Sequence, residues 1–372
     1  MFSNRSEVNL VKRKVNGKTV YYYVFYDDNG VRKYRSTGQK TKAAAWDYVM
    51  KRRDEGMLRF IDRSCVPFAE YAEPFFDYER CPIVRDKLAR GKSAARSTAY
   101  NRRIMFMGHV MPYFGKMPLS SITSEKVNSW LLELPGKDKL SQSTTNNCFN
   151  LLRLVMSQAV KDGILTRNPC DNIERLGDDS EACESFTMEE VWKIIGEPED
   201  WTNPMHRVMC LTAALTGMRI AEVYALQPED VFPDRIVIGW SYNDKDKRKT
   251  PKNGEKRIAP ITEDLYRQIM EFSHGPGKYI FSTGDGSRPM TYTCIYIAFN
   301  KRLKDLGIKD KTFHSFRAFV DTTLSMENIN ESVIQKMIGH KDRKMTEHYL
   351  HLESGDLRLI RDVQQKIEKG MA

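Results

Sequence analysis

The chain has 372 residues, about twice the length of a typical single domain, so two or three folded units are expected. Hydrophobic residues make up 41% and charged residues 29%, a balance that excludes a disordered or fibrous chain. The sequence contains no run of about 18 apolar residues, and its polar start lacks the apolar region of a signal peptide. We therefore expect a protein of the cytoplasm with no membrane partner.

Cysteine spacing and net charge narrow the possible class of protein further. The seven cysteines are irregularly spaced with no C-x-x-C pair, which favours reduced packing residues over a disulfide framework or a zinc site. The net charge of +10 favours a polyanionic partner, although it fits a ribosomal, RNA-binding or membrane-surface protein equally well. Residues 1–63 hold 15 Lys or Arg against 7 Asp or Glu, and so carry +8 of this charge.

The first segment predicts a small β-sheet backed by one helix. Short strands are expected at residues 10–15, 19–26 and 31–35, joined by Gly-containing hairpin turns, and Thr41 begins the helix. The side chains expected to face the helix are the alternating aromatics Tyr21, Tyr23 and Phe25.

Basic residues are expected on the other face of this sheet. One interpretation is a solvated surface. The other is a sheet that presents basic side chains to DNA, since two or three strands fit the major groove. The candidate DNA-binding residues are Arg13, Lys14, Lys18, Arg32, Lys33 and Arg35.

The middle of the chain predicts a helical unit. Apolar residues recur at helical spacing through Tyr100, Ile104, Met107 and Val110, and hydroxyl residues precede two later helices. The polar stretch 176–185 is an expected linker.

A capping box at Thr187 opens the last unit, which is mostly helical with a β insertion near residues 235–262. The predicted domains are residues 1–62, 63–176 and 177–372.

Four short clusters in the last unit carry chemically useful side chains. In the first, Gly217 can end a helix and leave Arg219 at the start of the next, with Glu222 one helical step away to hold the guanidinium from behind. Taken alone, such an arginine is more often a surface ion pair. In the second, a hairpin around Asn253-Gly254 displays Lys252, with Lys249 and Lys256 as rival candidates.

The other two clusters follow near the end of the chain. His314 and Arg317 are three residues apart and share one helical face, so one phosphate could contact both. Tyr349 follows His340 by nine residues. Taken singly, His340 could be a loop histidine and Tyr349 a packed aromatic residue.

In this order, the residues resemble the signature of the tyrosine recombinases, the phage integrase family: Arg219, Lys252, His314-x-x-Arg317, His340 and Tyr349. Lys252 is preferred because it precedes Pro260 by the eight-residue step of family hairpins. Phe316 and Ala318 depart from the common Leu and His beside Arg317.

The resemblance implies a multidomain fold, mainly α with small β elements. Its parts would be an N-terminal three-stranded sheet plus helix that binds arm-type DNA, a helical core-binding domain and a mixed α/β catalytic domain.

The family chemistry explains the choice of residue types. A phosphodiester repels an attacking anion, so Arg219 and Arg317 would clamp its two non-bridging oxygens and His340 would add a hydrogen bond. His314 would support proton transfer at the nucleophile Tyr349.

Lys252 would protonate the departing 5′ oxygen, and the product would be a 3′-phosphotyrosyl enzyme. The covalent link stores the bond energy, so no ATP is needed, and no cofactor or metal is expected.

The expected function is integration or excision of a phage or conjugative element. A Xer-type chromosome-dimer resolvase is the alternative within this chemistry, although such enzymes usually lack the arm domain, and a non-catalytic DNA-binding relative is the alternative outside it. The expected partners are double-stranded DNA with core and arm sites, a homotetramer on DNA, and an excisionase or host DNA-bending protein.

The C-terminal segment 356–367 carries an apolar stripe at helical spacing. By family resemblance it would dock on a neighbouring protomer. Packing on its own domain is the alternative.

Overall fold

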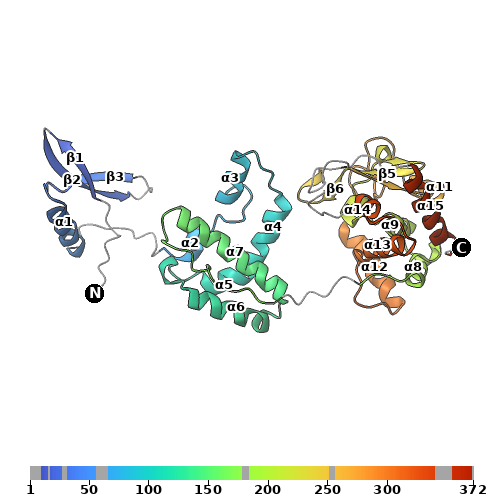
Figure 1. Ribbon diagram of the computed structural model, residues 1–372, viewed down its shortest axis with the longest axis horizontal. Coiled ribbons are helices and arrows are strands. Elements are labelled where there is room, and N and C mark those ends of the chain that lie inside the picture. The colour runs from blue at the N-terminus through green and yellow to red at the C-terminus, as the bar shows by residue number, and fades with distance from the viewer. Residues whose placement is uncertain are drawn as a thin grey trace. The chain divides into compact units, whose positions relative to one another are not determined.

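The computed structural model divides the chain into two compact units, Met1–Ser180 and Glu181–Ala372 (Figure 1). The residues that the structure describes are 10–15, 17–26, 32–55, 66–177, 184–250, 256–339 and 354–370.

The N-terminal part of the first unit is the expected sheet and helix. Strands β1 (Leu10–Val15), β2 (Lys18–Tyr26) and β3 (Arg32–Ser36) form an antiparallel sheet in the order β1-β2-β3. Helix α1 (Lys42–Asp54) packs on it through a small core in which Tyr23 and Val49 are fully buried. The predicted architecture of this segment is confirmed.

The basic residues of this sheet do not share one face. Arg13 lies on the face away from Tyr23, and its guanidinium stacks over Tyr22 and Tyr34 at 5.2 and 4.3 Å from the ring centres. Arg35 pairs directly with Tyr23 and so lies on the same face of the sheet. Lys14 pairs with Thr19, which lies on the same face of β2 as Tyr23 because side chains alternate along a strand.

The expectation of a single basic face is therefore wrong for Lys14 and Arg35, because the strand register places them on the α1 side. The side chains of Lys18, Arg32 and Lys33 lie outside the described part of the structure.

The rest of the first unit is helical, as predicted. Its helices are α2 (Phe68–Ala72), α3 (Pro82–Ala89), α4 (Arg96–Met105), the π-helical turn η2 (Phe106–Val110), α5 (Met111–Phe114), the 3-10 turn η3 (Leu119–Ser121), α6 (Ser124–Asp138) and α7 (Gln142–Lys161).

Hydroxyl caps and aromatic packing explain these helices. The Thr123 side chain accepts a hydrogen bond from Lys126 N at the start of α6, and the Ser141 side chain accepts one from Thr144 N at the start of α7. The core is aromatic and includes the buried side chains of Phe106, Phe114 and Trp130.

The apolar stripe predicted through Tyr100, Ile104, Met107 and Val110, which spans α4 and η2, is only partly buried. Val110 is buried, but Tyr100, Ile104 and Met107 remain 45 to 55% exposed. Helical spacing alone cannot distinguish a buried stripe from one that faces outward.

The second unit surrounds one central helix. Helix α9 (Pro204–Thr216) is buried from Val208 to its end, and the other elements pack around it. The capping box at Thr187 is present: its side chain accepts from Glu190 N, and the Glu190 carboxylate accepts from Thr187 N.

The remaining helices of this unit are α8 (Met188–Ile195), η4 (Pro198–Asp200), α10 (Ile220–Val223), η5 (Pro228–Asp230), α11 (Glu263–Met270), α12 (Tyr292–Asp305), α13 (Ser315–Met326), α14 (Glu331–Ile338) and α15 (Ser354–Lys369).

The predicted β insertion forms two small sheets. Strands β4 (Val231–Phe232), β5 (Arg235–Ile238) and β8 (Arg257–Pro260) are antiparallel in the order β4-β5-β8. Strands β6 (Ser241–Asn243) and β7 (Lys247–Lys249) form a separate hairpin.

The terminal helix α15 packs on its own unit. Ile360, Val363 and Ile367 are buried in the same core as α9. The Gln364 side-chain amide donates to the carbonyls of Leu215 and Pro260, both at 2.8 Å. The single chain thus shows the alternative packing on its own domain, and docking on a neighbouring protomer stays a prediction.

Candidate active site

The turn after α9 exposes the first expected arginine. Helix α9 ends at Thr216, and Gly217 takes a left-handed φ of 64° while its N–H donates to Ala213 O. Arg219 then occupies the N-cap position of α10, with 45% of its side chain exposed. The expected helix break and the exposure of the guanidinium are both confirmed.

Glu222 holds Arg219 as expected. Its carboxylate accepts a hydrogen bond from Arg219 N at 2.8 Å and another from Arg219 Nη1 at 3.1 Å. The Glu222 side chain is only 3% exposed. A buried carboxylate thus fixes both the backbone and the guanidinium of an arginine that remains open to solvent.

A second arginine, Arg257, also contacts Glu222. Arg257 Nη1 and Nη2 donate to the two Glu222 oxygens at 2.9 and 2.6 Å, and its Nε donates to Met337 O at 2.8 Å. Arg257 is absent from the residues expected above because it stands in a run of charged residues. The signal that marks it is its strand position, since it pairs with the buried Ile238 in the β5–β8 register.

The arginines determine the ionisation of Glu222. Burial raises the pKa of this carboxyl, but the hydrogen bonds and charge of Arg257, followed by those of Arg219, outweigh burial. The net pKa lies below the usual glutamate value. Glu222 is therefore ionised throughout the neutral range.

Helix α13 supplies the second expected pair of residues. His314 is its exposed N-cap residue, whereas Arg317 is only 2% exposed and donates from Nη1 to Gly217 O at 3.0 Å. Burial, followed by the charges of Arg219 and Arg257, lowers the pKa of Arg317 to about 9. At neutral pH the Arg317 guanidinium therefore remains charged.

The same charges act on His314. Partial burial lowers the pKa of its imidazole, and the charges of Arg317 and Arg219 lower it further. The ring is therefore mostly neutral at pH 7 and is able to accept a proton.

The structure brings Arg219, Glu222, His314 and Arg317 into one electrostatic cluster. The other three expected residues, Lys252, His340 and Tyr349, lie outside the described residues.

The two rival lysines are described. Lys249 Nζ pairs with Asp246 at 2.5 Å. The aliphatic part of the Lys256 side chain lies close to Gly239. A Cβ added to Gly239 would lie 3.0 Å from Lys256 Cγ.

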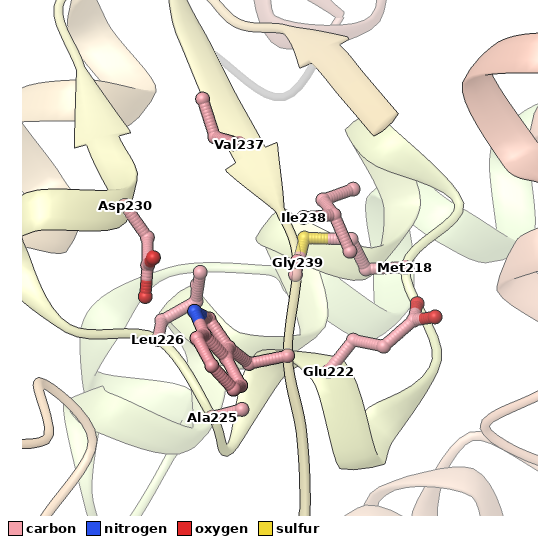
Figure 2. A pocket seen from close by; sticks show the side chains of 9 residues that line it. Met218, Glu222, Ala225, Leu226, Asp230, Val237, Ile238 and Gly239 are labelled. Atoms are coloured by element: carbon pink, nitrogen blue, oxygen red, sulfur yellow. The ribbon is translucent and has the colours of Figure 1, made fainter. Parts of the chain in front are cut away.

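A small hollow lies beside Glu222. It holds at most about 140 Å³, a figure that includes space open to solvent, and lies between α10 and the end of β5, as Figure 2 shows with Met218, Glu222 and Gly239. Small-molecule sites usually occupy about 300 to 1,000 Å³. The hollow is too small for such a ligand. Arg219 does not line it, and its exposed side chain can meet a partner at the surface.

These features suit phosphoryl transfer on a large anionic substrate. Fixed guanidinium groups stabilise charge that develops on phosphate oxygens, and a neutral imidazole accepts a proton. The fold and the site are those of a protein suited to act on a phosphodiester.

Comparison with known proteins identifies the family. Residues 184–355 match the Phage integrase family, and residues 92–134 match the phage integrase N-terminal SAM-like domain. The chain belongs to the phage integrase family and is a tyrosine-type site-specific DNA recombinase.

Among the described residues, no helix is both long and apolar enough to cross a membrane.

Two relatives are similar to this chain in sequence, and one solved structure is similar to it in fold. The integrase of Mycobacterium phage L5 is 22% identical over 312 residues, which cover 77% of this chain and 80% of the relative. The ICEBs1 integrase of Bacillus subtilis (strain 168) is 26% identical over 283 residues, covering 68% and 73%. A lambda integrase tetramer bound to a Holliday junction shares the fold, with a TM-score of 0.59 and 17% identity over 91% of this chain and 98% of that chain.

The lowered pKa of Glu222 predicts how its contribution to stability depends on pH. The stabilisation is fully present above the unfolded glutamate pKa of about 4.3 and is lost as the pH falls through the lower folded pKa. At pH 7, Glu222→Gln leaves the Arg257 charge uncompensated and should lower the free energy of unfolding by about 3 to 5 kcal/mol.

The measurement is urea unfolding of wild type and Glu222→Gln from pH 7 to pH 3. The difference between them should shrink below about pH 4.3, because the wild type then loses its own carboxylate. Glu189→Gln, which changes an exposed i,i+4 pair with Lys193, is the control and should differ from wild type by less than about 0.5 kcal/mol. A Glu222→Gln difference that is constant over this range would contradict the assignment.

Proposed function

We propose that the protein cuts and rejoins DNA at attachment sites through a 3′-phosphotyrosyl intermediate on Tyr349, and so integrates or excises a phage or conjugative element. The observation that carries this proposal is the cluster of Arg219, Glu222, His314 and Arg317, in which fixed positive charge surrounds a neutral imidazole. The names of the phage L5 and ICEBs1 relatives support the kind of element.

In this scheme the arginines stabilise the transition state. Arg219 and Arg317 bind the non-bridging oxygens of the scissile phosphate, and His340 donates a further hydrogen bond. Glu222 makes no contact with DNA and acts by orienting Arg219. The support is the pair of hydrogen bonds from Arg219 to Glu222, which leaves the rest of an exposed guanidinium for a phosphate.

Proton transfers accompany the exchange of bonds. The Tyr349 oxygen forms a bond to phosphorus while the bond from phosphorus to the 5′ oxygen breaks. The tyrosine proton passes to the neutral His314, and Lys252 protonates the departing 5′ oxygen. The new ester keeps the energy of the old one, so attack by a 5′-hydroxyl of another duplex restores the DNA without a nucleotide or metal cofactor.

We propose that the protein acts on DNA as a homotetramer in the cytoplasm. The core DNA would lie against the helical and catalytic domains, residues 63–176 and 177–372, and arm DNA against residues 1–62. The tetrameric form of the lambda integrase relative supports the stoichiometry. An excisionase or a host DNA-bending protein would set the direction of the reaction.

The N-terminal sheet distinguishes this function from its alternatives. A Xer-type chromosome-dimer resolvase has no use for an additional basic DNA-binding domain, whereas residues 1–63 hold most of the net charge of this chain. A non-catalytic relative has no need for an arginine oriented by a buried carboxylate. Both observations favour the integrase of a mobile element.

The nucleophile assignment predicts the behaviour of Tyr349→Phe. This variant lacks only the hydroxyl, so it should bind core-site DNA with wild-type affinity and form no covalent adduct. The measurement is adduct formation on a nicked suicide substrate, resolved by denaturing gel electrophoresis. Tyr296→Phe removes the same hydroxyl from a half-exposed tyrosine of α12 and is the matched control, which should retain the adduct. Adduct formation by Tyr349→Phe would reassign the nucleophile.

The arm-domain assignment predicts different effects for two neighbouring basic residues. Arg13 lies on the face of the sheet away from α1, and Lys14 lies on the α1 side. The quantity to measure is the slope of the logarithm of the DNA-binding constant against the logarithm of salt concentration, for the full chain on attachment-site DNA. If the outer face contacts phosphates, Arg13→Ala should reduce the size of this slope by about one, and Lys14→Ala should leave it unchanged. Equal slopes for all three proteins would argue against contact through this face.

A further inference from the structure

Arg257 is a charged residue to which the reaction scheme gives no role, although it contacts the centre of the site. It is the first residue of β8, and its side chain is 11% exposed. Its two Nη atoms donate to Glu222 and its Nε donates to Met337 O. The guanidinium is thus directed toward the protein on three of its nitrogens, which makes direct contact with DNA an unsuitable role.

The contact with Met337 fixes a second segment of the site. Helix α14 ends at Ile338, and Gly339 takes a left-handed φ of 75°. Carbonyls in the last turn of a helix lack partners within the helix and carry partial negative charge, so Arg257 satisfies one of them and is favourably placed. A Cβ on Gly339 would lie 3.1 Å from Arg257 Cδ, which shows how closely the two segments approach.

Three segments that carry proposed active-site residues therefore meet at one side chain. The Glu222 carboxylate holds Arg219, and His340 follows the end of α14 by two residues in the sequence. Strand β8 begins five residues after Lys252 in the sequence. A lysine has a single nitrogen and could not make the paired contact with Glu222 together with the contact to Met337. The geometry requires an arginine.

We propose that Arg257 is a positioning residue for DNA cleavage: it holds the Glu222 carboxylate that orients Arg219, and it fixes the end of α14 from which the chain continues to His340. The inference rests on the proposed function, because it acts through residues that bind the scissile phosphate. Loss of Arg257 should therefore weaken stabilisation of the charge on the phosphate oxygens rather than DNA binding.

A second arginine provides a matched control. Arg302 is 15% exposed, donates from Nη2 to Asp200 at 2.7 Å and to Lys193 O at 2.6 Å, and donates from Nε to Ile194 O. It thus joins a carboxylate to the end of a helix, α8, just as Arg257 does for α14. Substitution of Arg302 removes the same kind of contacts from α8 and η4.

The test compares two suicide substrates with the full-length protein. One carries a normal scissile phosphodiester, and the other a methylphosphonate, in which a methyl group replaces one charged oxygen. On the phosphodiester, Arg257→Met should slow covalent adduct formation by about 10- to 100-fold, the size of effect known for residues that orient metal ligands. On the neutral methylphosphonate the defect should fall to a small fraction of that value, because less charge remains to be stabilised.

Controls separate positioning from stability. Arg302→Met should show the same rate relative to wild type on both substrates. Arg257→Lys should show an intermediate defect with the same dependence on substrate charge. It replaces Arg257→Met in the comparison if Arg257→Met no longer binds DNA. Equal defects of the Arg257 variants on the two substrates would overturn the inference, as would a charge-dependent defect in Arg302→Met.

The outcome for the wild type distinguishes the inference from the function on which it rests. If wild-type protein forms no adduct on the phosphodiester, the proposed function fails. If wild type forms the adduct and the Arg257 variants show no dependence on phosphate charge, only the positioning role fails.

Discussion

One buried carboxylate determines the arrangement of the site. Glu222 is almost fully buried and receives hydrogen bonds from Arg219 and Arg257. Burial of an isolated carboxylate or guanidinium would cost several kcal/mol, so each of these groups depends on the others for its position. Through this one interaction, α10, β8 and the end of α14 are fixed relative to one another. The exposed part of Arg219 is thereby presented in a single orientation.

The charge balance of this cluster explains its chemistry. The charges of Arg219 and Arg257 act on Arg317, and Glu222 is the carboxylate that receives hydrogen bonds from Arg219 and Arg257. Burial, followed by the excess positive charge, lowers the pKa of Arg317 and of His314. A phosphodiester that enters the site supplies negative charge next to the arginines and finds a neutral imidazole. The excess charge thus favours substrate binding, and together with burial it keeps the proton acceptor neutral.

The sequence could predict the features that depend on short spacings. The capping box at Thr187, the helix break at Gly217 and the contact of Arg219 with Glu222 each involve residues at most four positions apart. The order of elements in both units was predictable for the same reason. The residues of the site itself followed from a family signature, which orders residues along the chain and says nothing of the contacts that support them.

Features that depend on long-range register could not be predicted in this way. Arg257 meets Glu222 across 35 residues of chain, and only the pairing of β5 with β8 shows that it faces inward. The division of Arg13 from Lys14 and Arg35 likewise follows from the register of β1, β2 and β3. The outward direction of Tyr100 depends on packing between helices, which hydrophobic spacing does not specify.

The most direct test of this arrangement is a crystal structure of the Tyr349→Phe protein on core-site DNA. We expect the scissile phosphate to lie within hydrogen-bonding distance of Arg219 and Arg317, while Glu222 still joins Arg219 to Arg257. A scissile phosphate bound away from these arginines, or a Glu222 carboxylate that has left Arg219, would contradict it.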